Sequence, residues 1–374
     1  MKQRPFRLFG IALVGVLVAT SSPLAAQSRG VQPPPPKVPL TVGLMAVGAV
    51  HEPDKGDYES ILKVDSLSAE SVAYTLSANV DDRRVNVRRK VTRQDMAHAH
   101  DWRPRYNEGD PDTYPGTTGG TLSADVLNEL KTKGQASLKA SIASDPLGGM
   151  LEGLLGGNAG ALGKLPGNAG GSKVEGTIRR VEPQSVPVSM LVNDSRVDLP
   201  AVHARGKLGG EPFDAYILDD PAMPLVLRWS LGDTGKRIVK ISYPTGNAPS
   251  HIEENLSKTG RAEVYGIYFD FARATIRPES EPVLKEIADV MKKNPAWKLS
   301  VEGHTDNIGG PTANQDLSTR RAAAVRKALV DRYHVASGRL TPAGFGASRP
   351  KETNDTLEGR ARNRRVELAR QPGA

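Results

Sequence analysis

The sequence predicts two domains of different fold class: an N-terminal β-rich antiparallel domain, either a sandwich or a small barrel, and a C-terminal α/β domain. Residues 40–243 contain short runs of alternating apolar and polar residues separated by turns, which is typical of antiparallel strands. From about residue 262, apolar strands alternate with segments of helical periodicity, which favours one sheet covered by helices. Residues 244–261, rich in proline and glycine, are expected to be the linker between them.

The first 26 residues have the parts of a secretory signal peptide. Lys2, Arg4 and Arg7 precede the uncharged run Leu8–Thr20, and small residues follow as far as Ala26. The apolar run is shorter than the roughly 20 residues that a permanent membrane-spanning helix needs. We therefore expect export with cleavage after Ala26. The alternative is an uncleaved anchor in the inner membrane, as in a stator-like protein.

Composition narrows the choice of partners. The chain has a formal net charge of +8 and contains no cysteine. The positive charge favours anionic partners such as nucleic acid, lipid head groups or a glycan polymer, and export argues against nucleic acid. Without cysteine the chain forms no disulfide and carries no lipid on a cysteine. Residues 27–39 are rich in proline and predict a polyproline-II spacer before the first domain.

The β-rich domain is expected to be a soluble one, with a low-complexity insertion at about residues 120–172. Leu122, Val126 and Leu130 have helical spacing, and Thr121 or Ser123 can cap that helix before the glycine-rich part begins. A membrane-spanning barrel needs aromatic girdles and strands of about 10 residues. Only 5% of this chain is aromatic, and its predicted strands are short and charged.

The strand predicted from Arg83 to Arg93 alternates valine with arginine. It therefore has one apolar face and one cationic face. The charges are either solvated on an edge strand or in contact with anionic glycan or lipid. Outer-membrane proteins or lipid are accordingly possible partners of the β-rich domain.

We find no catalytic, metal or cofactor motif. His98 and His100 can share one face, but no further ligand completes a metal site, and exposed loop histidines are the expectation. No nucleophile with a base and no glycine-rich phosphate loop is present, so the sequence predicts a protein that is not an enzyme.

The C-terminal domain, residues 262–370, is predicted to alternate strands and helices. Pro278 is expected to begin a helix that ends at Asn294 and Pro295, and a capping box begins at Asp355. The expected strands are Val264–Phe271, Lys298–Glu302, Leu340–Phe345 and Val366–Leu368, with a second helix from Asn314 or Leu317 to Tyr333.

This domain carries a series of motifs in a fixed order, and together they resemble the OmpA-like peptidoglycan-binding domain, also found in Pal lipoproteins and MotB stator proteins. The resemblance covers about the last third of the chain. The motifs are Phe269-Asp270, Gly303-His304-Thr305-Asp306, Asn314, Leu317-Ser318, Arg321-Ala322, Gly344-Phe345-Gly346 and the run from Gly359 to Glu367.

The resemblance implies non-covalent binding of the meso-diaminopimelate in the peptidoglycan stem peptide. One carbon of that residue bears an ammonium and a carboxylate. By the resemblance, Asp306 accepts from the ammonium and Arg321 holds the carboxylate through two hydrogen bonds. Thr305, Asn314 and Arg364 match family positions around the same pocket, whereas Arg320 is out of register and has no assigned role.

Each residue also has a structural alternative. Asp306 can cap its loop or pair with a helix arginine, His304 is expected to be a loop histidine with satisfied hydrogen bonds, and the arginines from Arg360 to Arg365 can be solvated or paired. The sequence as a whole predicts a periplasmic, wall-associated protein at the outer-membrane side. The alternatives are a wall-localised envelope enzyme and the anchored stator-like protein.

Overall fold

The computed structural model describes residues 37–53, 55–80, 83–105, 111–141, 173–244, 251–270 and 272–371. These residues lie in one compact unit, Pro35–Ala374. The predicted signal peptide, most of the proline-rich spacer, the glycine-rich residues 142–172 and linker residues 245–250 lie outside the described residues.

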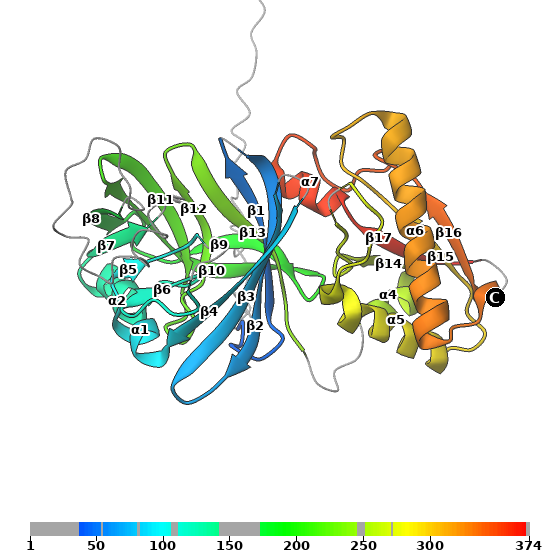
Figure 1. Ribbon diagram of the computed structural model, residues 1–374, viewed down its shortest axis with the longest axis horizontal. Helices are drawn as coiled ribbons and strands as arrows, with labels where there is room; N and C mark the ends of the chain where they lie inside the picture. The colour runs from blue at the N-terminus through cyan, green and yellow to red at the C-terminus, as the bar shows by residue number, and fades with distance from the viewer. Residues whose placement is uncertain are drawn as a thin grey trace, which may run out of the picture. The chain divides into compact units, whose positions relative to one another are not determined.

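The N-terminal domain is β-rich, as predicted, and its strands form one curved, barrel-like sheet (Figure 1). Neighbouring strands are antiparallel except where β5 pairs with β6 and β7 and where β13 pairs with β9. The strands are β1 (Met45–Glu52), β2 (Gly56–Leu67), β3 (Ser71–Val80), β4 (Arg83–Thr92), β5 (Asp101–Trp102), β6 (Thr117–Thr118), β7 (Gln135–Ser141), β8 (Lys173–Arg180), β9 (Val186–Val192), β10 (Ser195–Leu208), β11 (Glu211–Leu218), β12 (Val226–Leu231) and β13 (Thr234–Ser242), with helices α1 (Arg93–His98) and α2 (Ala124–Thr132).

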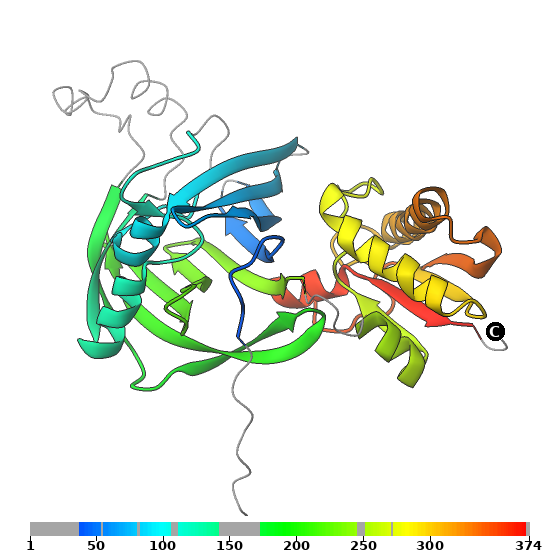
Figure 2. The same cartoon turned by 90° about the horizontal axis from the view of Figure 1, so that it is seen from below.

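Apolar side chains fill the concave side of this sheet. Trp102 packs edge-to-face on Trp229 with ring centroids 5.4 Å apart, and α2 contributes Leu127 and Leu130 to the same cluster. Figure 2 shows α2 inside the curve of the strands. A cavity of about 20 Å³ beside Trp102 has room for roughly one water molecule. The interior is therefore a packed core.

Part of the predicted insertion belongs to this core. The expected helix begins as predicted, with the Ser123 side chain accepting from the Val126 backbone N–H, but it ends at Thr132. Residues Gln135–Ser141 form strand β7 instead of continuing the helix, and Leu138 is buried. The predicted low-complexity insertion at about residues 120–172 therefore does not include residues 120–141, which belong to the packed domain because alternate residues of β7 pack under α2.

The cationic strand and the histidine pair also differ in detail from their predictions. β4 is an edge strand with buried Val87 and Val91, but it ends at Thr92, and Arg93 begins α1. Arg89 is buried and stacks on Tyr114 at 4.2 Å instead of being solvated. His98 ends α1 rather than lying in a loop.

The C-terminal domain has a four-stranded sheet in the order β14-β17-β15-β16, with helices on one face (Figure 1). Only the β15–β16 pair is parallel. None of the helices in the described ranges is long and apolar enough to cross a membrane. The elements are α4 (His251–Thr259), β14 (Arg261–Val264), η2 (Pro278–Ser280), α5 (Glu281–Lys293), β15 (Leu299–Gly303), α6 (Pro311–Tyr333), η3 (Ser337–Arg339), β16 (Leu340–Gly344), α7 (Leu357–Asn363) and β17 (Val366–Arg370).

The predicted linker contains a helix. Ile252 and Leu256 of α4 are buried in the C-terminal core, together with apolar residues of α5 and α6. Residues 251–261 therefore belong to the C-terminal domain, and the first strand, Arg261–Val264, begins and ends earlier than predicted.

Close packing of α6 against the sheet positions the loop that carries the predicted site. A Cβ atom on Gly303, the last residue of β15, would lie 2.3 Å from the Ser318 carbonyl oxygen of α6. Only glycine allows that approach. The chain therefore leaves β15 directly beside α6, and the following loop shares one end of the domain with that helix.

Candidate functional site

Asp306 lies in the loop after β15 and is almost buried, 7% exposed. Its Oδ1 accepts a hydrogen bond from the Ile308 backbone nitrogen at 3.1 Å, and its Oδ2 pairs with Nη1 of Arg364. Asp306 therefore both caps its loop and pairs with an arginine, the two structural alternatives considered from the sequence. The arginine is the C-cap of α7, not a residue of α6.

Asn314 and Thr305 shape this loop. The Asn314 side-chain nitrogen donates to the carbonyl oxygens of Asp306 at 3.2 Å and Ile308 at 3.0 Å. Thr305 donates its backbone N–H to the Gly346 carbonyl, while its hydroxyl is buried without a hydrogen-bond partner among the described residues. These two residues therefore hold the loop that presents Asp306.

Arg321 reaches the same end of the domain from α6. Its Nε donates to the Arg273 carbonyl at 3.0 Å, and its guanidinium carbon lies 4.8 Å from the centre of the Phe269 ring. Burial lowers the pKa of Arg321 to about 10, so the group stays charged at neutral pH. Arg320 points elsewhere and pairs with Asp316, as its register predicted.

Arg364 lies between two carboxylates. Its Nη1 contacts Asp306, while its Nη2 and Nε lie 2.5 and 3.2 Å from Oε1 of Glu59 on strand β2. Burial disfavours its charge, but the charges of Glu59 and Asp306 outweigh burial and raise its pKa. Arg364 is therefore a firmly held cation.

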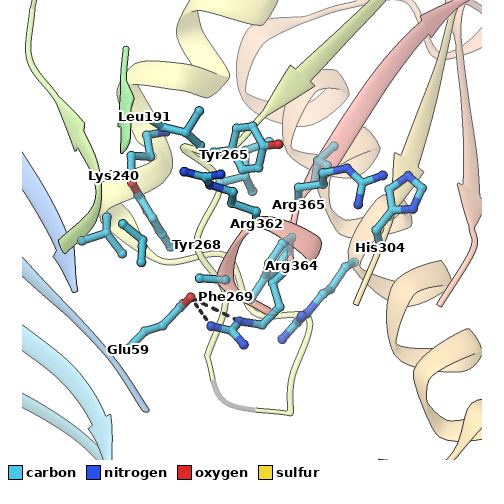
Figure 3. A pocket seen from close by; sticks show the side chains of 17 residues that line it. Glu59, Leu191, Lys240, Tyr265, Tyr268, Phe269, His304, Arg362, Arg364 and Arg365 are labelled. Carbon is cyan, nitrogen blue, oxygen red and sulfur yellow. Dashed lines mark hydrogen bonds and ion pairs between the residues drawn. The ribbon is translucent and has the colours of Figure 1, made fainter. Parts of the chain in front are cut away.

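Arg321 and Arg364 line one cavity of about 70 Å³, together with Phe269, His304 and Glu59 (Figure 3). Asp306 borders this cavity through its contact with Arg364. The structure thus brings Arg321 and Arg364 to one cavity, with Asp306 in contact with Arg364. Thr305 and Asn314 support the loop and do not line the cavity.

His304 differs from its prediction. It is 2% exposed, and neither ring nitrogen has a hydrogen-bond partner within the part of the chain that the structure describes. Its ring stacks on Phe345 at 5.5 Å. Burial is the main cause, with Arg365 the next, of a pKa lowered to about 4, so His304 is neutral at pH 7.

Glu302, His304 and Glu367 each bring one possible metal-ligand atom within 4.8 Å of the others. Both carboxylates are already paired: Arg261 contacts Glu302 and lies 2.8 Å from Glu367, and Arg365 lies 2.5 Å from Glu367. A metal ion would have to displace these arginines from a buried network. We assign the cluster to holding β14, β15 and β17 together.

The structure adds two residues that sequence reasoning missed. Phe269 was quoted within a motif but given no role, and it stacks under Arg321. Glu59 comes from the N-terminal domain, 305 residues before Arg364, and no local pattern could have indicated its contact.

Residues 268–364 match the sequence model of the OmpA family. The C-terminal domain is an OmpA-like domain. The resemblance predicted from the motifs is thereby confirmed for these residues, and the family match does not extend into the barrel-like domain.

Curated relatives match the same part of the chain. Outer membrane porin F of Pseudomonas aeruginosa is 48% identical over 101 residues, which are 27% of this chain and 29% of the porin. Motility protein B of Bacillus subtilis is 36% identical over 108 residues, or 27% of this chain and 41% of that protein. A solved peptidoglycan-associated lipoprotein from Burkholderia pseudomallei is 28% identical, with a TM-score of 0.27, over 28% of this chain and 88% of that one.

These matches leave most of each chain uncovered. The chain spans only 29% and 31% of the length of the porins F of Pseudomonas aeruginosa and Pseudomonas fluorescens. The comparisons therefore concern the OmpA-like domain alone.

Proposed function

We propose that this protein binds peptidoglycan non-covalently through its OmpA-like domain and so links its barrel-like domain to the cell wall. The family match supports the proposal for residues 268–364. The observation that carries it is that Arg321 and Arg364, at motif positions of that family, line one small cavity, and that Asp306 contacts Arg364.

The proposed ligand is the free end of meso-diaminopimelate, which bears an ammonium and a carboxylate on one carbon. Within the described residues, the two terminal nitrogens of Arg321 have no hydrogen-bond partner, since only its Nε is engaged. Two such N–H groups match the two oxygens of a carboxylate. Arg321 takes the carboxylate in this proposal, and Arg364 lies on the same cavity wall.

Asp306 takes the ammonium. Each of its oxygens has one contact in the structure, to the Ile308 backbone or to Arg364. A carboxylate has about four lone-pair positions, so it can accept a further hydrogen bond. Thr305 and Asn314 support this contact by fixing the loop that presents Asp306.

The proposed location is the periplasm, on the cell wall at the outer-membrane side. The outer-membrane name of the porin relative supports an envelope protein, and the relatives reported above are named as a porin and a motility protein rather than as enzymes. Accordingly, we propose a non-enzymatic wall-binding role. The barrel-like domain would then engage an outer-membrane protein or lipid.

The test is co-sedimentation of the full-length protein with purified sacculi that contain diaminopimelate. We expect Arg321→Ala to weaken binding by at least about tenfold, because it removes a half-buried cation from the carboxylate contact. Free diaminopimelate should compete with sacculi, and sacculi with lysine at that stem position should bind weakly, because lysine lacks the second carboxylate.

The matched control is Arg320→Ala, which removes the same charge one residue away from an exposed pair with Asp316. It should sediment like the parent. Equal sedimentation of the Arg321→Ala protein would show that the site is elsewhere, and absence of competition by diaminopimelate would reject that ligand.

A further inference from the structure

The cavity that we propose for diaminopimelate already contains a carboxylate from the same chain. Glu59, on strand β2 of the barrel-like domain, lies 2.5 Å from Nη2 of Arg364, and Figure 3 shows this side chain reaching across to Arg364. Glu59 also lines the cavity that Arg321 lines. Neither the family motif nor the comparisons involve this residue.

Glu59 interacts electrostatically with both arginines of the site. Its charge is the larger of the two that raise the pKa of Arg364. It is also the foremost charge opposing the effect of burial on the pKa of Arg321, ahead of Asp306. Glu59 therefore offers these arginines the chemical group that the ligand's carboxylate would offer.

We propose that Glu59 acts as an internal ligand that competes with the diaminopimelate carboxylate for the Arg321–Arg364 wall of the cavity. This inference rests on the proposed function of that site. Glu59 holds Nη2 and Nε of Arg364, and the terminal nitrogens of Arg321 that we assign to the ligand carboxylate line the same cavity of about 70 Å³. Two carboxylates in so small a space repel each other, so diaminopimelate binding favours a state in which Glu59 has left Arg364. The protein thus has a closed state, in which Glu59 holds Arg364, and an open state that binds peptidoglycan.

Other contacts hold Glu59 in place. Tyr268 and Ala361 of the C-terminal domain share one apolar cluster with Met45, Val47 and Ile61 of the barrel-like domain. Polar contacts surround this cluster: Arg360 with Asp57 at 2.6 Å, Arg84 with Glu279 at 2.8 Å, and Arg277 with Ser77 at 2.6 Å.

Apparent affinity falls in proportion to the fraction of molecules in the binding-competent state, so occupation of the site by Glu59 sets how weakly the free protein binds.

The experiment compares Glu59→Gln with the parent in the full-length chain, using sacculi at a series of concentrations. Glutamine has nearly the same shape and lacks the charge, so we expect sedimentation with roughly two- to fivefold tighter binding, the range that loss of a partly exposed ion pair allows. Glu59→Ala should give the same direction of change, which protects the result against a local effect of glutamine.

The matched control is Asp65→Asn, on the same strand. Asp65 contacts Lys63 and Thr75 within the barrel-like domain, so this change removes an equal charge without touching the site. It should bind sacculi like the parent. If any loss of a negative charge tightened binding by reducing repulsion from anionic peptidoglycan, Asp65→Asn would tighten it as much as Glu59→Gln.

The outcomes distinguish the two proposals. Equal or weaker binding by Glu59→Gln, while the parent sediments and Arg321→Ala does not, would overturn the internal ligand and leave wall binding intact. Equal tightening by Asp65→Asn would also overturn it. Failure of both the parent and Glu59→Gln to sediment at saturating sacculi would instead reject the proposed function.

Discussion

The two domains bury charge in different ways. In the barrel-like domain, buried ionisable residues are scattered: Glu52, Arg89, His203 and Lys240 lie on four different strands. Each has local contacts, such as Asp194 at 2.8 Å from Lys240. In the OmpA-like domain, most buried charges lie on β15, in the loop that follows it, and on β17 or the residue just before it: Glu302, Asp306, Arg365 and Glu367.

The difference reflects two roles of buried charge: isolated pairs within a packed core in the barrel-like domain, and a connected network beside the proposed ligand site in the OmpA-like domain. A scattered buried charge needs only its own partner, and the barrel-like core around it is apolar and filled. A cluster needs a network in which each charge depends on several others, and such networks are sensitive to the loss of one member. In this protein the network adjoins the cavity that carries the proposed ligand contacts.

The largest expected effect comes from breaking the network at Glu367. This carboxylate is 2% exposed and receives hydrogen bonds from Arg261 and Arg365. Burial opposes its charge, but these arginines outweigh burial and lower its pKa to about 2. Glu367→Ala should destabilise the OmpA-like domain by about 3–5 kcal/mol, because the buried Arg365 loses its carboxylate partner.

Thermal unfolding followed by far-ultraviolet circular dichroism measures this effect, since α5 and α6 give the domain its helical signal. The matched control is Asp289→Ala, which breaks the exposed pair with Lys285 on α5 and should leave the midpoint unchanged. Equal midpoints for the two variants would mean that the network contributes no more than a surface ion pair.

A smaller effect is expected in the apolar core of the barrel-like domain. Leu127 of α2 is fully buried, so Leu127→Ala should destabilise the barrel-like domain by about 3 kcal/mol through lost burial and a residual cavity. Tryptophan fluorescence reports it, because Trp102 and Trp229 lie in the same cluster. Sedimentation of the folded protein with sacculi should not change.

The control is Val42→Ala, since Val42 is 49% exposed and should contribute within about 0.5 kcal/mol. A loss of wall binding by folded Leu127→Ala protein would contradict the division into a packed domain and a recognition domain.

Much of the OmpA-like domain was predictable because its signals are local. The apolar stripes and caps predicted α5, α6 and α7, and the motif series indicated Asp306 and Arg321. By contrast, α4 was missed. It has only two buried apolar residues, Ile252 and Leu256, and it lies in a segment rich in proline and glycine, which indicates a linker. Strand β7 was not predicted, because its two alanines and its one lysine favour helix and its alternation is short.

The remaining features depend on contacts between distant segments. Glu59 reaches Arg364 only because β1 and β2 pack against the OmpA-like domain, which no single stretch of sequence encodes. His304 was expected to have satisfied hydrogen bonds. Its burial follows from the stacking of Phe345 and from the loop fold, both of which require the assembled sheet.

The smallest expected effect is the loss of stability at acid pH that His304 causes. The pKa of His304 is lowered to about 4 by burial first and Arg365 second, whereas an unfolded histidine titrates near 6.5. As pH falls below about 6.5, His304 binds a proton in the unfolded chain, whereas in the folded domain it binds one only near pH 4. The contribution of His304 to stability is therefore complete above pH 6.5 and is lost as pH falls from 6.5 to 4. Between pH 7 and pH 5 the loss should be about 1–2 kcal/mol. His304→Phe keeps a ring against Phe345 but cannot titrate, so its unfolding midpoint should fall less over the same interval. If the parent and His304→Phe lost equal stability, the acid sensitivity would come from other groups, and titration of His304 would not distinguish the OmpA-like domain from the barrel-like domain.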